Sequence, residues 1–187
     1  MTARAVLPRI TPDDLLAMPD GDAYELIDGR LRMMEMSAQS SSLGSVITIL
    51  LGIHVRPNRL GRLCGSDASF RCFSDDPDKI RRPDVAYLSH ARLPLETYRA
   101  AGHIPVCPEL VVEVLSPNDL ADDMDRKIRD WLSAGASAVW SVHPAVQQVW
   151  VHQADGAITV VGPGGVVTAE DILPGFRMAV DDVFLDQ

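Results

Sequence analysis

The sequence lacks the features that mark membrane-spanning and secreted proteins. No uninterrupted apolar run among its 187 residues approaches the ~20 residues that a membrane-spanning helix needs. The first residues, Met1-Thr2-Ala3-Arg4, do not form the apolar core of a secretory signal. We therefore expect a cytoplasmic protein that has no membrane partner.

Cysteine is scarce, and its spacing excludes two further classes of protein. The three cysteines, Cys64, Cys72 and Cys107, are odd in number and never stand in the CxxC spacing of zinc sites. A disulfide framework needs cysteines in pairs, so we expect three free thiols in a reducing compartment.

Lysine is scarcer still, and the chain is acidic. Only Lys79 and Lys127 are lysines among 17 basic residues, and the formal net charge is −9 at pH 7. This charge argues against a protein that coats nucleic acid nonspecifically, because phosphate binding needs a local density of cations. It leaves room for a local basic groove. A lysine in so arginine-rich a chain carries slight weight as a catalytic candidate, because its compact charge suits chemistry that arginine does not.

Helix and turn signals divide the chain into short elements of both kinds. Helices are predicted after Thr11-Pro12, over residues 40–55 and 122–134, and near the C-terminus; strands are predicted at 24–27, 31–36, 62–64, 69–73, 83–88, 110–115, 138–142, 148–152 and 158–161. Residues 89–108 have no clear period and indicate a surface excursion. This order favours one α/β domain over residues 1–187, with a mixed central β-sheet flanked by helices.

Glu113 is the most informative residue, because it interrupts a strongly apolar run. Residues 109–115, Glu-Leu-Val-Val-Glu-Val-Leu, lie between Pro108 and Pro117 and are typical of a strand buried on both faces. An unpaired ionised carboxylate there costs on the order of several kcal/mol. A structural glutamate would therefore need a partner, and we favour a functional role that includes a cation.

Asp84 repeats this pattern at the mouth of the apolar segment 85–88. Taken alone, Asp84 after Pro83 is better explained as a turn cap. Two acids on neighbouring buried strands together suggest a metal site, because Mg²⁺ and Mn²⁺ prefer hard oxygen ligands.

Lys127 completes the set, since it lies on the helix predicted directly after the Glu113 strand. It can fold back toward the end of that strand and assist a metal-bound water that attacks a phosphodiester. Taken alone, Lys127 would more simply form a solvated ion pair with Asp123, four residues earlier. Glu25, which precedes a hairpin turn, is by itself better explained as a surface or cross-strand residue.

Five segments in order resemble one known family, and together they span nearly the whole chain. These segments are Tyr24-Glu25-Leu26-Ile27-Asp28-Gly29, Arg82-Pro83-Asp84-Val85-Ala86, Pro108 to Pro117, Asp123 to Lys127 followed by Gly135, and Leu173-Pro174-Gly175-Phe176. They resemble the putative restriction endonuclease family of the PD-(D/E)XK nuclease superfamily. The stretch around Glu113 that ends in Ser116-Pro117 is the most specific piece of this resemblance.

The resemblance implies a restriction-endonuclease-like fold and DNA cleavage that depends on Mg²⁺ or Mn²⁺. It assigns Asp84 and Glu113 as the metal ligands, with the carbonyl of Val114 as a third. These roles come from the family's motif positions.

The resemblance also implies a displaced lysine. The superfamily usually has a lysine two residues after the glutamate, where this chain has Leu115, and the family resembled here has it on the following helix, which corresponds to Lys127. Glu25 matches an N-terminal glutamate that reaches the same cleft, as an outer or second-metal ligand. Two positions depart from the family: Leu43 stands where many relatives have histidine, and His143-Pro144 replaces the usual Asp-Pro.

The leading functional prediction is a DNA endonuclease, and homodimerisation is plausible because cutting both strands favours two-fold symmetry. An alternative, motivated by the acidic net charge, is a weak or inactive nuclease fold that binds nucleic acid or serves as an assembly module. A third and weaker candidate is a two-carboxylate hydrolase that acts on sugars. Sensitivity to metal chelation separates this third candidate from the first.

Overall fold

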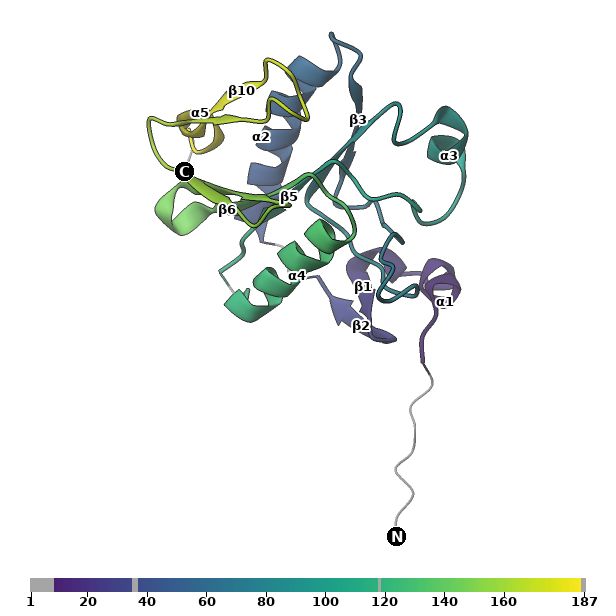
Figure 1. Ribbon diagram of the computed structural model, residues 1–187. Coiled ribbons are helices and arrows are strands. Elements are labelled where there is room, and N and C mark those ends of the chain that lie inside the picture. The colour runs from purple at the N-terminus through teal and green to yellow at the C-terminus, as the bar shows by residue number, and fades with distance from the viewer. Residues whose placement is uncertain (1–8, 35–36, 118, 186–187) are drawn as a thin grey trace.

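A six-stranded mixed sheet forms the centre of the computed structural model, which describes residues 9–34, 37–117 and 119–185 (Figure 1). The helices are α1 (Pro12–Ala17), α2 (Ala38–Val55), α3 (Leu95–Arg99), α4 (Ala121–Ser133) and α5 (Val180–Val183), with 3₁₀ turns η1 (Gly21–Ala23) and η2 (Pro144–Val146). The central strands are β3 (Gly61–Gly65), β4 (Val85–Ser89), β5 (Leu110–Val114), β6 (Ala138–His143), β7 (Gln148–Gln153) and β8 (Ile158–Val161), which lie in this order. Two small sheets pair β1 (Tyr24–Ile27) with β2 (Arg30–Met33) and β9 (Val166–Thr168) with β10 (Arg177–Ala179).

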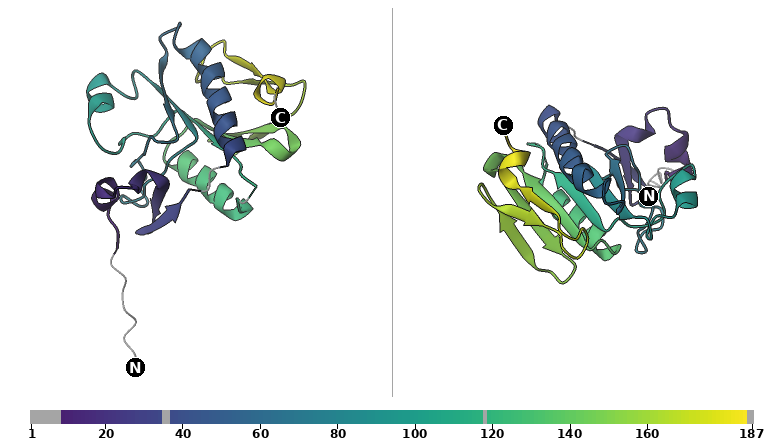
Figure 2. Two further views of the ribbon diagram at one scale, coloured as in Figure 1. Left: turned by 180° about the vertical axis from the view of Figure 1, so that it is seen from behind. Right: turned by 90° about the horizontal axis from the view of Figure 1, so that it is seen from above.

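The two long helices cover opposite faces of the central sheet. Successive side chains of a strand point to opposite faces, and β5 follows this rule. Val112 packs in a cluster with Leu51 of α2, whereas Val111 packs in a cluster with Trp131 of α4. In Figure 1 α4 lies in front of the sheet and α2 behind it, and the view from behind in Figure 2 reverses this order.

The parallel pair β5–β6 explains the position of α4. All other neighbours in the central sheet are antiparallel, but β5 and β6 run in the same direction. A parallel pair needs a crossover connection, which is usually a helix. Helix α4 supplies this connection and therefore begins close to the end of β5, where Glu113 lies.

The β1–β2 hairpin is fixed beside the sheet by its turn and by one strand-like bridge. Asp28 and Gly29 both have positive φ angles, which two-residue hairpin turns require and which glycine adopts without strain. Leu26 and Ile80 exchange two backbone hydrogen bonds and pack in a small apolar cluster. The hairpin is therefore held against the segment that leads into Asp84.

Two predicted features of the chain are wrong. The apolar segment 69–73 is not a strand, because only Phe70 forms bridges there, one to Arg81 and one to Ile104. Residues 89–108 are more than a surface excursion, since they contain α3 and the buried side chains of Leu93 and Cys107. The bridge between Phe70 and Ile104 joins these two segments through the backbone.

Helix α2 is long and apolar enough to cross a membrane by length and composition alone, with 18 residues and a mean hydropathy of 1.3. One such helix is weak support for a membrane span, since the core helix of a globular domain passes the same test. Here Leu43, Ile47, Leu51 and Val55 of α2 are fully buried in the main apolar cluster. This face of α2 is the packing face of a core helix.

Replacing Ile47 by Ala should lower the free energy of unfolding by about 2–5 kcal/mol, because it opens a cavity under α2. Ile49→Ala is the matched control, since Ile49 lies on the same helix with 61% of its surface exposed while Ile47 is fully buried. The control should change stability by less than about 1 kcal/mol. Urea unfolding followed by circular dichroism measures both, and equal losses would contradict the packing of α2 described here.

Candidate active site

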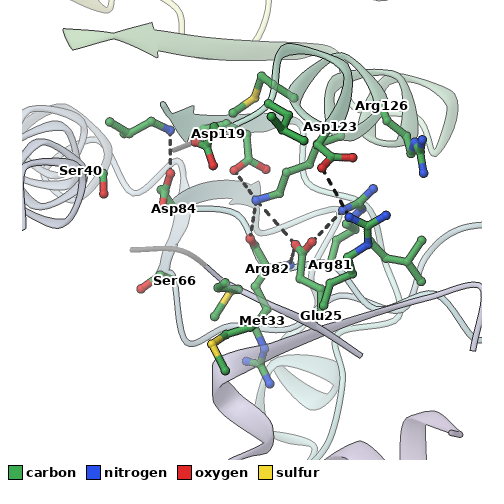
Figure 3. A pocket seen from close by; sticks show the side chains of 18 residues that line it. Glu25, Met33, Ser40, Ser66, Arg81, Arg82, Asp84, Asp119, Asp123 and Arg126 are labelled. Carbon is green, nitrogen blue, oxygen red and sulfur yellow. Dashed lines mark hydrogen bonds and ion pairs between the residues drawn. The ribbon is translucent and has the colours of Figure 1, made fainter. Parts of the chain in front are cut away.

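A cavity of about 470 Å³ opens between the β1–β2 hairpin, the ends of β4 and β5, and α4. Its lining includes every residue that the sequence proposed for the site: Glu25, Asp84, Glu113, Val114 and Lys127. Figure 3 shows the side chains of Glu25, Asp84 and Asp119 gathered around this cavity. Residues that are 102 positions apart in the chain, from Glu25 to Lys127, thus meet in one place.

Glu113 has only 1% of its surface exposed, and both of its carboxylate oxygens have partners. The Nε1–H of Trp131 donates to Oε1 at 2.7 Å, and Nζ of Lys127 lies 2.7 Å from Oε2. Trp131 and Lys127 are four residues apart on α4 and therefore project from the same side of the helix. Trp131 is fully buried, and its hydrogen bond to Glu113 is a contact that the sequence did not reveal.

Lys127 reaches into the cavity and does not pair with Asp123. Its Nζ donates to the carbonyl of Arg82 at 3.1 Å and lies 3.6 Å from Oε1 of Glu25. Asp123 instead pairs with Arg32 of β2 at 3.4 Å. The simple interpretation of Lys127 as a solvated helical ion pair is therefore wrong.

Asp84 lies at the point where the ladder between β4 and β5 ends. Its Oδ2 accepts a hydrogen bond from the backbone N–H of Val114 at 2.6 Å, so it is not simply the cap of a local turn. Among the described residues, no protein group donates a hydrogen bond to its Oδ1. This oxygen is free to bind a ligand.

Glu25 is buried, so the interpretation as a surface residue is wrong. Its Oε2 lies 2.7 Å from a guanidinium nitrogen of Arg81, and its Oε1 accepts from the backbone N–H of Arg82 at 2.8 Å. Arg81 also donates from Nε to Asp130 of α4 at 3.0 Å. Arg81 therefore joins Glu25 on β1 to Asp130 on α4.

A model of the Uma2 family, described as putative restriction endonuclease, matches residues 12–181 of the chain. The chain belongs to this family. The match covers most of the chain and confirms the resemblance that the sequence segments predicted. No curated protein matches the chain.

One solved structure agrees with the Uma2 assignment in its fold. The crystal structure of a putative nuclease belonging to DUF820 from Anabaena variabilis ATCC 29413 has a TM-score of 0.78, covering 94% of this chain and 98% of that chain. The two sequences are 23% identical, so the likeness shows the fold alone. The predicted α/β class, a mixed central sheet flanked by helices in a nuclease-like fold, is confirmed.

Burial and charge shift the pKa values of the central groups in this Uma2 protein. Burial raises the pKa of Glu113 to about 7; the charge of Asp84 adds to this rise and Lys127 opposes it. Burial also raises the pKa of Asp84, again against the effect of Lys127. Burial alone would raise the pKa of Glu25, but Lys127 and Arg81 outweigh it and hold that pKa below its usual range.

Lys127 itself remains protonated. Burial would lower its pKa, but the carboxylates of Glu113, Glu25 and Asp84 outweigh burial and hold the pKa above the usual range of lysine. A charged ammonium donates hydrogen bonds and cannot accept a proton. Lys127 can therefore orient a water or stabilise negative charge, but it cannot act as a general base in this state.

The donor set at the cavity floor fits Mg²⁺ or Mn²⁺. These ions take a few carboxylate and carbonyl oxygens and retain several waters, which matches Asp84, Glu113 and the carbonyl of Val114. In addition to burial, the charge of Asp84 raises the pKa of Glu113, and the charges of Asp119 and Glu25 raise the pKa of Asp84, so a cation beside these two carboxylates would relieve the repulsion. Within the described ranges, no cluster of three or more Asp, Glu, His or Cys side chains is arranged to hold a metal, so waters would complete the coordination.

The sequence missed other polar residues that line the cavity. Asp119 follows β5 and accepts from the backbone N–H of Ser116 at 2.7 Å, and its charge contributes to the raised pKa of Asp84. An acid just after the end of a buried strand is the signal that could have identified it. Arg32 and Arg126 also line the cavity; Arg126 lies within the segment 123–127, but no role was predicted from the sequence for either arginine.

The two departures from the family have structural explanations. Leu43 is fully buried in the main apolar cluster, and the cavity is instead lined by Ser40, one turn earlier on α2. His143 stacks on Trp150 with ring centroids 4.3 Å apart, and its Nε2 lies 3.0 Å from the hydroxyl of Ser141. Helix α2 therefore still contributes a polar group to the cavity.

In the metal-free protein, one glutamate carboxyl should titrate near pH 7, and this titration should be absent from the Glu113→Gln variant. Lys127→Met should raise this pKa further, and Asp84→Asn should lower it, because the two charges act in opposite directions. Since the pKa in the folded state is raised, the stability from protonated Glu113 is full below its ordinary value of 4.5 and is lost as pH rises through about 7. Carbon-13 NMR of labelled glutamate measures the titration, and a set of glutamates that all titrate below about 5 would contradict it.

Proposed function

We propose that this chain is a metal-dependent nuclease that hydrolyses phosphodiester bonds in DNA with Mg²⁺ or Mn²⁺. Membership of a family described as putative restriction endonucleases supports the nuclease class. The observation that carries the proposal is the buried Glu113 carboxylate, which lies 2.7 Å from Lys127 in a cavity that Asp84 also lines. Buried opposite charges beside a second carboxylate are typical of functional sites, where perturbed pKa values cluster.

The proposed ligands are the carboxylates of Asp84 and Glu113 and the carbonyl of Val114. Asp84 has one oxygen fixed by the Val114 N–H, which sets its orientation before any ligand binds, and its other oxygen has no donor among the described residues. The metal, when bound, would lower the pKa of a coordinated water and neutralise charge on the phosphate. The three protein groups would hold the metal at the floor of the cavity, where its charge would attract the scissile phosphate.

Lys127 is the proposed partner of the attacking water. Its ammonium group stays protonated, so it would donate a hydrogen bond that orients the water and would stabilise negative charge as it develops on the phosphate. Its contacts to the Arg82 carbonyl and Glu113 fix the position of this charge.

Glu25 is proposed as a residue that holds Lys127 and Arg81 in place. Its carboxylate lies between the ammonium of Lys127 and the guanidinium of Arg81, and this position between two cations favours an outer role over direct coordination of a second metal. A second-metal role would require Glu25 to exchange one of these partners. Homodimerisation and a cytoplasmic location stay predictions.

A sugar hydrolase is less well supported than a nuclease. Sugar sites commonly use aromatic platforms, and none of the described residues that line this cavity is aromatic. A catalytically inactive binding module shares the fold, and only an activity measurement separates it from the nuclease.

Glu113→Gln should abolish metal-dependent cleavage of supercoiled and single-stranded DNA, because it removes a ligand charge at the cavity floor. Lys127→Ala should lower the rate by about 100- to 1000-fold, the range for loss of one group that stabilises transition-state charge. Gel assays with Mg²⁺, Mn²⁺ and EDTA measure both. Arg129→Ala, an exposed position on the same helix that does not line the cavity, is the control and should leave the rate unchanged.

Calorimetric titration with Mn²⁺ gives a second readout of the same site. Native protein should bind the ion, and Glu113→Gln should weaken binding strongly while the protein stays folded. Cleavage that persists in EDTA would exclude the metal-dependent mechanism. DNA binding without cleavage by the native protein, retained in Glu113→Gln, would establish a binding module on a nuclease fold.

A further inference from the structure

We propose that Arg32 and Arg126 bind substrate phosphates on two sides of the cavity mouth. In the free protein Asp123 pairs with Arg32, and a substrate phosphate replaces Asp123 as its partner. This inference rests on the proposed function and adds a binding step to it. Arg32 and Arg126 would bind the DNA backbone as it enters the cavity, whereas Asp84, Glu113 and Lys127 would act on the reacting phosphate.

The three residues lie on facing walls of the same cavity. Arg32 is on β2 of the hairpin, and Asp123 and Arg126 are three residues apart on α4, so they project from neighbouring positions on that helix. The Arg32–Asp123 ion pair, with 3.4 Å between Nη1 and Oδ2, joins the two walls. A DNA strand that enters between the hairpin and α4 would meet this ion pair.

The other cations that line the cavity are already engaged in the interior. Lys127 and Arg81 pair with buried carboxylates at 2.7 Å. Arg82 is buried and donates to backbone carbonyls, including that of Tyr24 at 3.1 Å. In the part of the chain that the structure describes, Arg126 is the cavity-lining cation whose side chain forms neither an ion pair nor a hydrogen bond to the protein, and Arg32 forms only an exposed ion pair.

The Arg32–Asp123 pair is suited to exchange. The two side chains are 52% and 43% exposed, and exposed ion pairs contribute little stability because water screens them. A phosphate offers a guanidinium two parallel hydrogen bonds, which is a better partner than one oxygen at 3.4 Å. Arg32 can therefore leave Asp123 for a phosphate at small cost.

The carboxylates that line the cavity oppose the binding of DNA, and the two arginines would offset this repulsion. Glu113, Asp84 and Asp119 line the cavity, and together they repel a polyanion that approaches without a metal. Two arginines at the mouth would attract the phosphates that flank the reacting one. The apolar side chains of Met33 and Leu120, both exposed at the cavity, can contact the sugar and base between these phosphates.

Fluorescence anisotropy tests the proposal with a labelled DNA hairpin that carries a single-stranded tail, in Ca²⁺ in place of Mg²⁺, at 50 to 200 mM NaCl. Arg32→Ala and Arg126→Ala should each reduce the slope of log affinity against log salt by about 0.7 to 0.9, the contribution of one phosphate contact. Asp123→Asn should instead tighten binding by about two- to fivefold, because it releases Arg32 from an exposed ion pair.

Two matched controls separate these contacts from general charge effects. Asp122→Asn removes the same charge from the same first turn of α4, and Arg129→Ala removes the same cation from the same helix; neither residue lines the cavity. In an Arg32→Ala background, Asp123→Asn should bring no more gain than Asp122→Asn, because there is no arginine left to release.

Each outcome decides the question. This inference is overturned if the native protein binds DNA but Arg32→Ala has the same salt dependence as Arg129→Ala. It is also overturned if the native protein binds DNA but Asp123→Asn has the same affinity as Asp122→Asn. Either result leaves the proposed nuclease function intact. A native protein that binds no DNA overturns the proposed function and this inference with it.

Discussion

The buried carboxylate of Glu113 is the constraint on which the centre of this protein depends. It lies on the face of β5 that α4 covers, where water cannot solvate its charge, so the protein must supply partners. Helix α4 provides two of them, the indole of Trp131 and the ammonium of Lys127. Removing Lys127 would leave a buried acid without a cation, whereas a bound metal would give Glu113 a second one. The residue therefore links the packing of α4 to the chemistry proposed for the cavity.

Alternating charges extend from this carboxylate to the rest of the cavity. Lys127 approaches Glu25 on β1, Glu25 pairs with Arg81, and Arg81 pairs with Asp130 back on α4. Asp130 also accepts from Lys79 at 2.9 Å. The network joins a hairpin, an extended segment and a helix that are distant in sequence. It positions the proposed catalytic groups on packed elements, so their geometry is set before a substrate arrives.

Local sequence patterns predicted most strands of the central sheet. Contacts between residues that are distant in the sequence were the main feature that they did not predict. The apolar run around Glu113 and the Asp28-Gly29 turn carry their structure within a few residues, so both were predictable. The hydrogen bond of Trp131 to Glu113 depends on the way α4 packs on β5, and composition does not encode it. Segment 69–73 was predicted as a strand, but only Phe70 forms bridges there, one to Arg81 and one to Ile104, and neither bridge extends into a ladder.

The placement of the lysine on α4 also determines which changes of chain length the protein can accept. Asp123, Lys127, Asp130 and Trp131 occupy one side of this helix, and each has a partner in the cavity or beneath it. One residue inserted within α4 between Asp123 and Lys127 would rotate these two residues by about 100° relative to each other. The helix could then keep the partner of Asp123 or the partners of Lys127, Asp130 and Trp131, but not all of them, whereas a lysine on β5 would be unaffected. Loops around the cavity can therefore vary in length, but the spacing of these residues within α4 must be kept.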